Sequence, residues 1–405
     1  MTEWSRAPLG EVARVVGGTT PPTATETNYG GDVTWVTPAD LGQLHEPLIT
    51  SSARKITEAA RRTSGLELLP TGTVVMSSRA PIGHLGIASV AVCTNQGCKS
   101  FVPGPRLDSW FLYYSLLVQM PRIRALGAGA TFAEVSKTDM EGFQISFPPL
   151  PEQRRIAATL REQRAVAHGM RESMNQARLH VREVDAAIRR DFFARLPRQA
   201  ARLDFLIGDP GAIIDGPFGS NLKGDHYESS GIRVIRLGNI GLGTFIDVDR
   251  AYVTPAHAAR LQRHKADVGD VVIAALGDGA RPAGRACLVP DWLHESIVKA
   301  DCFRVRTSGS ALDGAFLMHV MNSPQTLDYV RASTRGATRP RMNLQMLKEL
   351  NIPVPSLEEQ KRIVAELDSR LAEIGRIDLG IRVEQEAIDA LPAALLRRAF
   401  DEVAA

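Results

Sequence analysis

Loops rich in glycine, small hydroxyl residues and isolated cations are the parts of this chain that could bind a ligand. VVGGTTPPTATETNYGG and DGPFGSNLKGDHYESSG stand at similar places in the two halves, and SSRAPIGH, CTNQGCKS, RPAGRA, IVKADCFRVR and STRGATRPRMN follow them. Such loops can bind phosphate through amides and hydroxyls, and base edges through Arg, Asn and Gln. An ordinary solvated turn is the alternative for each single residue. The candidate nucleic-acid contacts in these loops are Gly18, Thr19, Thr20, Ser77, Ser78, Arg79, Asn95, Gln96, Lys99, Phe218, Gly219, Ser220, Asn221, Lys223, Arg236, Asn239, Arg281, Lys299, Arg335 and Arg341.

Catalytic motifs are missing from the sequence. Its Pro-Pro pairs stand in TPPT and FPPL, and neither is the N-P-P-Y or D-P-P-Y tetrapeptide of an amino-methyltransferase. Glu359-x-Lys361 lies at an expected helix start without a nearby strand Asp, which favours surface charge over a magnesium-dependent nuclease. GDGARPAGRA matches no phosphate-binding loop, and the nine His form no closely spaced ligand pair. We therefore expect no catalytic residue, cofactor or metal site in this chain.

Composition is typical of a soluble globular protein. Of the 405 residues, 44% are hydrophobic and 23% are charged, and this length suggests two to four folding units. The net charge of +3 requires a nucleic-acid binder to gather its cations in patches. Four scattered Cys fit free buried thiols in a reducing compartment. The start MTEWSRAPLG is unlike a signal peptide and WFLYYSLLVQM is too short to span a bilayer, so we expect a cytoplasmic protein without membrane contact.

One sequence motif occurs twice, with each residue 207 positions before its partner. PPLPEQRRIAATL in the first half matches PSLEEQKRIVAEL in the second, and each follows a short apolar segment expected to be a strand. Ser356 and Glu359 form the S-x-x-E pattern of a helix start, and proline is tolerated at the same place in the first copy. We expect scaffold and partner-docking roles for the repeated polar residues Glu152, Gln153, Arg155, Glu359, Gln360 and Arg362.

A heptad pattern follows each copy of this motif. In the first helix it runs through Ile156, Leu160, Gln163, Ala167, Met170, Met174, Ala177, Val181, Val184 and Ile188. In the second helix it runs through Ile363, Leu367, Arg370, Ile374, Ile377, Ile381, Glu384, Ile388, Leu391 and Leu395. The spacing predicts a coiled coil. The alternative is that each helix packs as an ordinary amphipathic helix on its own domain.

Charge favours pairing of these two helices with each other. Residues 151–198 hold eleven Arg against six acidic residues, whereas 356–405 hold seven basic against eleven acidic residues. Opposite flanking charges select a partner helix, and two internal copies related by a pseudo-two-fold axis pair antiparallel. Pro392 is expected to kink or break the second helix.

The remaining segments contain short apolar runs separated by turn residues, which indicates strands. TGTVVMSS and VGDVVIAALGD are one weakly matching pair, so the two segments look like divergent copies of one fold. We expect an α+β protein with two similar strand-rich domains and two long helices in an antiparallel coiled coil. The expected boundaries are 1–148 for the first domain, 149–198 for the first helix, 199–354 for the second domain and 355–405 for the second helix.

These stretches resemble the specificity subunit of type I restriction–modification systems. The resemblance rests on GGTTPP, GGDVTWVTPADL, LLPTGTVVMSSRAPIGHLGIA, TNQGCKS and FPPLPEQRRIAATL in the first half, and on DGPFGSNLK, RVIRLGNIG, GDVVIAALGD, VKADCFRVR and IPVPSLEEQKRIVAEL in the second. It covers essentially the whole chain. It implies two target-recognition domains, each reading one half of a split DNA site, and two conserved helices that set the spacer.

The resemblance also implies partners and leaves alternatives open. The helices would dock two modification subunits, which would bind adenosylmethionine and methylate adenine. A separate restriction subunit would use ATP and magnesium for translocation and cleavage. The alternatives are the specificity protein of a methylation-only phage-defence system, a self-contained DNA enzyme with an unrecognised motif, and a coiled-coil adaptor that never contacts DNA.

Overall fold

The structure is a computed structural model that describes residues 4–127, 133–197, 199–277, 281–333 and 340–401. The chain divides into two compact units, and each contains one globular domain and part of both long helices. Unit 1 holds residues 1–174 and 384–405, and unit 2 holds residues 175–383. The two units are described one at a time.

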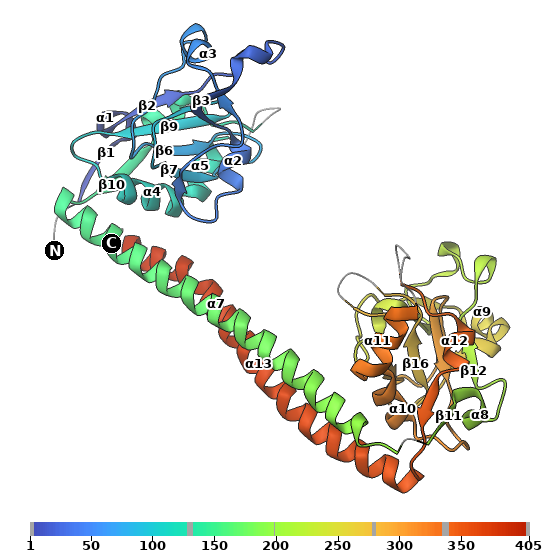
Figure 1. Ribbon diagram of the computed structural model, residues 1–405. Helices are drawn as coiled ribbons and strands as arrows, with labels where there is room; N and C mark the ends of the chain where they lie inside the picture. The colour runs from blue at the N-terminus through green and yellow to red at the C-terminus, as the bar shows by residue number, and fades with distance from the viewer. Residues whose placement is uncertain (1–3, 128–132, 198, 278–280, 334–339, 402–405) are drawn as a thin grey trace. The chain divides into compact units, whose positions relative to one another are not determined.

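The globular part of unit 1 is built from short strands and short helices (Figure 1). Its strands are β1 (Ser5–Pro8), β2 (Ala13–Gly17), β3 (Tyr29–Val36), β4 (Leu48–Ile49), β5 (Lys55–Ile56), β6 (Val74–Ser77), β7 (Leu85–Ala88), β8 (Val92–Thr94), β9 (Cys98–Pro103) and β10 (Gln144–Phe147). Its helices are α1 (Leu9–Val12), α2 (Pro38–Gly42), α3 (Glu58–Thr63), α4 (Ser109–Val118), α5 (Met120–Leu126) and α6 (Lys137–Gly142), with the 3-10 turn η1 (Glu26–Asn28).

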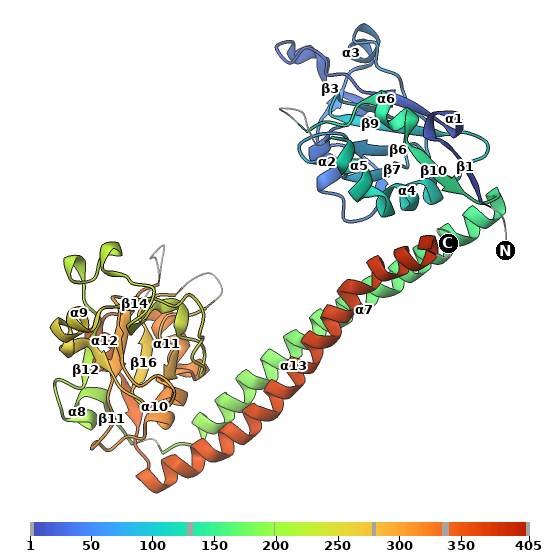
Figure 2. The same cartoon turned by 180° about the vertical axis from the view of Figure 1, so that it is seen from behind.

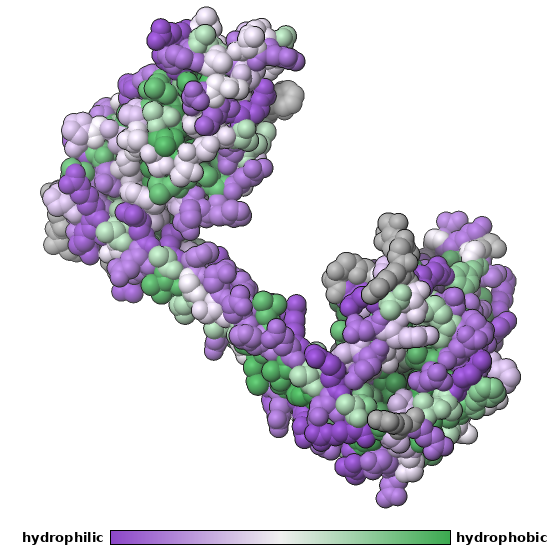
Figure 3. All heavy atoms as spheres, in the orientation of Figure 1, coloured by the Kyte–Doolittle hydropathy of each residue, from purple (hydrophilic) through white to green (hydrophobic). Residues whose placement is uncertain are grey.

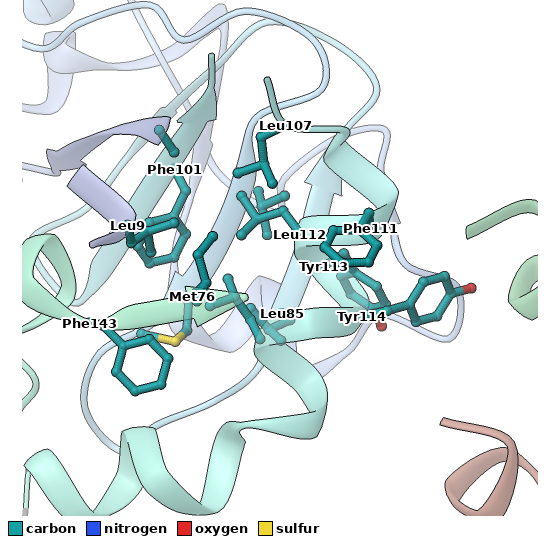
Figure 4. Packing of buried hydrophobic residues seen from close by; sticks show 14 of the residues in the cluster. Leu9, Met76, Leu85, Phe101, Leu107, Phe111, Leu112, Tyr113, Tyr114 and Phe143 are labelled. Carbon is teal, nitrogen blue, oxygen red and sulfur yellow. The ribbon is translucent and has the colours of Figure 1, made fainter. Parts of the chain in front are cut away.

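These strands form three sheets with one large core beside them. The orders are β2-β9-β6-β7-β4, β5-β3-β8 and β1-β10. Helix α4 packs on β6 and β7, and its buried Phe111, Leu112 and Tyr114 belong to the same core as Met76 and Phe101, with Leu112 lying towards these two residues (Figure 4). The backbone amides of Trp110 and Phe111 bind the Asp108 carboxylate, which caps the start of α4.

Unit 2 repeats this construction with shorter strands. The strands are β11 (Ala200–Arg202), β12 (Ile213–Asp215), β13 (Ile232–Ile235), β14 (Tyr252–Val253), β15 (Lys265–Ala266), β16 (Val271–Ala274), β17 (Ala286–Leu288), β18 (Ser296–Val298), β19 (Cys302–Val305) and β20 (Asn351–Pro353). The helices are α8 (Leu203–Ile207), α9 (Pro255–Arg260), α10 (Gly314–Met321), α11 (Pro324–Ser333) and α12 (Leu344–Lys348), with the 3-10 turns η2 (Gly219–Asn221), η3 (Gly224–His226), η4 (Leu237–Asn239) and η5 (Gln262–His264).

The two domains share their strand order. The sheet β12-β19-β16-β17 matches β2-β9-β6-β7, and the sheet β14-β13-β18-β15 contains the parallel pair β13–β18 as unit 1 contains β3–β8. The small sheet β11-β20 matches β1-β10, and Asp313 caps α10 as Asp108 caps α4. The α+β class and the similarity of the two domains are confirmed.

Two helices of 45 residues each, α7 (Leu150–Ala194) and α13 (Leu357–Asp401), complete both units. In unit 1 the first turns of α7 share a core with Leu396 and Phe400 near the end of α13. In unit 2 the first turns of α13 share a core with Phe192 near the end of α7. The helices therefore pair antiparallel, and both views show them side by side (Figures 1 and 2).

The expected break at Pro392 is wrong, because α13 continues through it to Asp401. Proline removes one backbone donor from the helix. The turns beyond it are anchored independently, since Leu396 is buried and Phe400 packs 5.4 Å from the ring of Phe111. Packing of this end therefore compensates for the lost hydrogen bond.

The buried stripe of each long helix differs from the expected one at several of its positions. Leu160, Ala167, Met174, Val181 and Ile188 do face inward on α7, as do Leu367, Ile374, Ile381, Ile388 and Leu395 on α13. Met170 is 43% exposed, and the neighbouring Arg171 is the less exposed of the two. In the same way, Asp185 is less exposed than its neighbour Val184 on α7, and Asp378 is less exposed than its neighbour Ile377 on α13. The apolar periodicity could not show these polar positions, because Arg171 pairs with Asp389 at 2.6 Å and Asp378 pairs with Arg178 at 3.7 Å between the two helices.

Candidate nucleic-acid interface

The expected ligand loops of unit 1 meet where several strands of its main sheet begin or end, on one side of the domain. Gly17 at the end of β2 pairs with Lys99, and Ser77 at the end of β6 pairs with Cys98 at the start of β9. The opposite end of β9 leads to Asp108, which binds the first turn of α7. The loops therefore lie at the ends of the strands that are remote from the start of the long helix.

The loop at 18–20 rests directly on the loop at 94–96. A Cβ atom at Gly18 would lie 2.1 Å from the carbonyl oxygen of Asn95, so only glycine fits there. The amide of Thr19 donates to the carbonyl of Thr94 at 3.0 Å, and the Thr20 hydroxyl contacts the Gln96 side chain. Gln96 and Thr19 are exposed, so this pair of loops presents amide and hydroxyl groups to solvent.

A cation cluster lies next to these loops. Arg79 forms a β-bridge with Glu134, and its guanidinium lies 3.8 Å from the Glu134 carboxylate. Lys99 Nζ lies 3.2 Å from Glu134 and 3.2 Å from the Ser78 hydroxyl. A Cβ atom at Gly97 would lie 3.4 Å from Nε of Arg79. Arg79, Glu134 and the Asn95–Gly97 turn therefore form one surface.

Three expected DNA contacts of unit 1 need correction. Ser77 and Ser78 have no exposed surface, and the Ser77 hydroxyl donates to Pro81 and accepts from the amides of Gly83 and His84. Lys99 is buried as well and is bound to Glu134. These side chains cannot reach a base edge. They brace the loops that carry Arg79, Asn95 and Gln96.

Unit 2 has the equivalent edge. Gly216 follows β12, and a Cβ atom there would lie 2.0 Å from the carbonyl oxygen of Lys299, as Gly18 lies against the turn at Asn95. Lys299 Nζ stands 5.4 Å from the ring centroid of Tyr227. Arg341 pairs with Asp301 at 2.9 Å and stacks at 5.7 Å over Phe218. Exposed Gly219, Asn221 and Lys223 extend this surface.

Other expected contacts of unit 2 have structural partners. Asn239 is buried, accepts from the amide of Arg236 and donates to the carbonyls of Ile246 and Val248, so direct base contact by Asn239 is wrong. Arg236 is half-buried and pairs with Asp249. Arg281 donates to the carbonyl of Gly238 at 3.4 Å. Ser220 lies in η2, and Arg335 lies outside the described residues.

Sequence reasoning missed the residues that support these loops. Glu134 and Asp301 are the acids beside the guanidinium groups of Arg79 and Arg341. Glu134 stands outside the stretches singled out from the sequence, whereas Asp301 lies inside IVKADCFRVR, where only Lys299 was selected. Arg285 has no exposed surface and donates to the carbonyls of Ile240 and Leu276, among others, which holds two loops together. The RPAGRA glycine-rich turn was the one available signal, and it pointed to ligand contact instead.

The repeated helix-start motif attaches each long helix to its own domain. Gln153 and Gln360 have no exposed surface, which makes partner docking through their side chains wrong and supports a scaffold role. Glu152 pairs with Arg155 at 2.6 Å, and Glu359 pairs with Arg362 at 2.6 Å. The facing guanidinium lowers the pKa of each of these two carboxyl groups. All four charged side chains remain at the surface.

Apolar side chains are also exposed along the helices. They include Val166 and Met170 in unit 1, and Leu179, Val184, Ile377, Leu379 and Val383 in unit 2. Hydrophobic patches interrupt the hydrophilic face of the helices that Figure 3 shows. Separately, a hollow of about 660 Å³ in unit 1 is lined by Trp110, Tyr114, Arg161, Arg164 and His168, among others. Within the described residues, no group of three or more His, Cys, Asp or Glu could hold a metal ion, and no helix is long and apolar enough to cross a membrane.

Comparison with known proteins identifies the family. A relative from Methanocaldococcus jannaschii, the type I restriction enzyme MjaIX specificity subunit, is 33% identical over 160 residues, which are 39% of this chain and 37% of that protein. The type I restriction enzyme EcoBI specificity subunit of Escherichia coli is 22% identical over 76% of this chain and 69% of its own length. The first of these alignments thus spans well under half of the relative's length.

Solved structures share the fold over nearly the whole chain. A chain from a study of complex assembly and conformational transition of the type I R-M system has a TM-score of 0.72 at 18% identity and covers 98% of this chain and 97% of its own. The HsdS subunit from Thermoanaerobacter tengcongensis has a TM-score of 0.60 at 18% identity, covering 99% and 97%. The model of the type I restriction modification DNA specificity domain matches residues 1–165 and 295–379. The chain therefore belongs to the type I restriction modification DNA specificity domain family.

Proposed function

We propose that this chain is the DNA sequence-specificity subunit of a type I restriction–modification complex. It binds a bipartite, asymmetric site in double-stranded DNA, and each globular domain reads one half of that site. The observation that carries the proposal is the repeated loop cluster. Two domains of one topology carry it at the same ends of their strands, with half-buried Arg79 and exposed Gln96 in the first and exposed Lys223 and Arg341 in the second.

The parts of the chain have separate tasks in this proposal. Residues 1–148 and 199–354 are the target-recognition domains. Residues 149–198 and 355–405 set the spacer between the half-sites and dock two modification subunits. The exposed apolar side chains of the helices, such as Val166 and Leu379, fit docking because apolar surface on a helix pair gains from burial against a partner.

Partner subunits supply the chemistry. The modification subunits bind adenosylmethionine and methylate adenine, and restriction subunits use ATP and magnesium to translocate and cleave DNA in the cytoplasm. This chain contributes no reacting group. Its exposed cations add salt-sensitive phosphate contacts, which make affinity fall as the salt concentration rises.

The test is to map methylated adenines in the host genome with and without this gene. A split motif with a fixed spacer that disappears with the gene is the expected result. Methylation without cleavage of unmodified DNA would identify a methylation-only system. Methylation or cleavage by the purified chain alone, given magnesium and adenosylmethionine, would overturn the proposal. So would failure of the full complex to shift a random double-stranded pool at modest salt.

A further inference from the structure

Backbone hydrogen bonds establish which residues of the two sheet edges correspond. The amide of Val135 donates to the carbonyl of Ser78 at 3.0 Å in unit 1, and the amide of Met342 donates to the carbonyl of Ala275 at 2.8 Å in unit 2. Glu134 and Arg341, one residue earlier, therefore occupy the same place. The β-bridges agree, because Arg79 pairs with Glu134 and Leu276 pairs with Arg341.

The turn beside this bridge corresponds in the same way. The carbonyl of Gly97 accepts from the amide of Ser78 at 2.8 Å, and the carbonyl of Asp301 accepts from the amide of Ala275 at 2.8 Å. The three matched positions read Arg, Gly and Glu in unit 1 and Leu, Asp and Arg in unit 2. Each edge thus has one guanidinium and one carboxylate, but on different segments. Simple inheritance of a salt bridge from a common ancestral domain does not produce this exchange.

The geometry of both pairs suits base recognition better than phosphate binding. The side chains of Arg79 and Arg341 are 42% and 47% exposed, and those of their acids Glu134 and Asp301 are 38% and 30% exposed. A neighbouring carboxylate compensates the positive charge, which weakens attraction to phosphate. It also restricts the side-chain rotamers, so the planar fork is held ready for the two acceptors of guanine.

We propose that Arg79 and Arg341 are equivalent specificity-determining residues, and that each reads one guanine in its own half-site while Glu134 and Asp301 hold the guanidinium in place. This inference rests on the proposed function. It adds the base that is read, the two residues that read it, and a common position for that base relative to each domain.

The test is selection of bound sequences from a random double-stranded pool by the full complex, with the chain in wild-type form or carrying Arg79→Ala or Arg341→Ala. Each variant is expected to lose about 5- to 150-fold discrimination at one guanine of one half-site, with the other half-site unchanged. Arg79→Lys keeps the charge but lacks the fork, so it should lose the same preference. Glu134→Gln should bind non-specific DNA more tightly while its guanine preference falls.

Controls separate this inference from the proposed function. Arg14 lies on β2, towards the end of the strand that is remote from the loops, and pairs with Glu67 at 2.6 Å. Arg14→Ala should therefore leave the selected motif intact. Arg202→Ala, which removes the pair with Asp204, is the matched control in unit 2. A wild-type complex that selects no split motif refutes the proposed function. A wild-type split motif that Arg79→Ala and Arg79→Lys leave unchanged, or binding weakened equally on all sequences, refutes this inference alone.

Discussion

The side-chain oxygen of Gln153 accepts a hydrogen bond from the backbone amide of Asp108 at 2.9 Å, and Gln360 accepts one from Asp313 at 2.8 Å. The carboxamide nitrogen of Gln153 donates to the carbonyls of Arg106 and Pro148. Each glutamine thus joins the start of a long helix to the cap of the helix on the sheet. The glutamine of the repeated motif therefore makes the same joint in both copies.

Replacing Gln153 with Ala should therefore destabilise unit 1. The amide of Asp108 and two carbonyls would lose their partner in a buried site, which costs about 1–3 kcal/mol in the free energy of unfolding. Urea denaturation of the full chain measures this cost. The exposed Gln176 on the same helix is the control, and Gln176→Ala should change stability by no more than about 0.5 kcal/mol. Equal losses of stability for Gln153→Ala and Gln176→Ala would contradict the role of Gln153 in joining α7 to its domain.

The shifted seam of the long helices predicts opposite outcomes for two apolar residues of the heptad pattern. Ile374→Asp places a charge in the half-buried seam and should lower the free energy of unfolding by about 2 kcal/mol or more. Met170→Asp should cost no more than about 0.5 kcal/mol, because Met170 faces solvent. Circular dichroism during urea denaturation measures both. A large loss for Met170→Asp in the isolated chain would restore the heptad register expected from the sequence.

Solvent exclusion at the four cysteines predicts their reactivity. All four thiols are free and buried, and desolvation raises the pKa of Cys93 to about 11 and those of Cys98, Cys287 and Cys302 to about 12. The thiolate is the reactive form. The folded protein should therefore resist a thiol-reactive dye at mildly alkaline pH, and four thiols should react after addition of guanidinium chloride. Rapid labelling of one thiol in the folded chain would show that its strand opens.

The organisation of the fold was predictable because its signals are periodic. Two long stripes and one repeated helix start specify the antiparallel helices and the duplicated domains. The seam was mispredicted at several positions because Arg171 and Asp378 are polar yet pair with residues of the partner helix. Hydropathy cannot distinguish an Arg whose stem covers a seam from one that projects into water.

The site was predictable by loop and not by residue. Glycine and hydroxyl composition located both loop clusters, but it could not separate Gln96, which is exposed, from Ser78, which is buried under the same loop. Glu134 comes from a segment distant in the sequence from the selected loops, and Asp301 stands two residues after Lys299 but faces Arg341, which is 40 residues later. Their placement depends on strand pairing, which a single sequence does not specify.

His319 of α10 contacts both long helices in unit 2. Its Nε2 lies 2.7 Å from a carboxylate oxygen of Asp368 on α13, and its Nδ1 lies 3.5 Å from the Arg189 guanidinium on α7. Burial is the main cause that lowers the pKa of His319, and Arg189 acts in the same direction. The carboxylates of Asp368 and Asp185 oppose this shift.

A lowered pKa in the folded state means that folding favours the neutral imidazole. Stability from this group is therefore complete above the unfolded-state pKa of about 6.5, and it declines as the pH falls below that value. The equivalent position of α4 holds Tyr114, counted from the capping Asp108, so His319→Tyr is a replacement that this fold already accommodates.

We expect His319→Tyr to reduce the loss of stability between about pH 7.5 and pH 5.5, whereas His168→Gln, at an exposed position of α7, leaves that loss unchanged. Urea denaturation of the full chain at both pH values measures the difference. If His319→Tyr instead increased the loss of stability at pH 5.5, the prediction would be wrong. The pairing of His319 with Asp368 would then outweigh the effect of burial on its pKa. Because, of these two residues, only His319 lies between α10 and the long helices, a difference between the two variants attributes the pH dependence of stability to that contact.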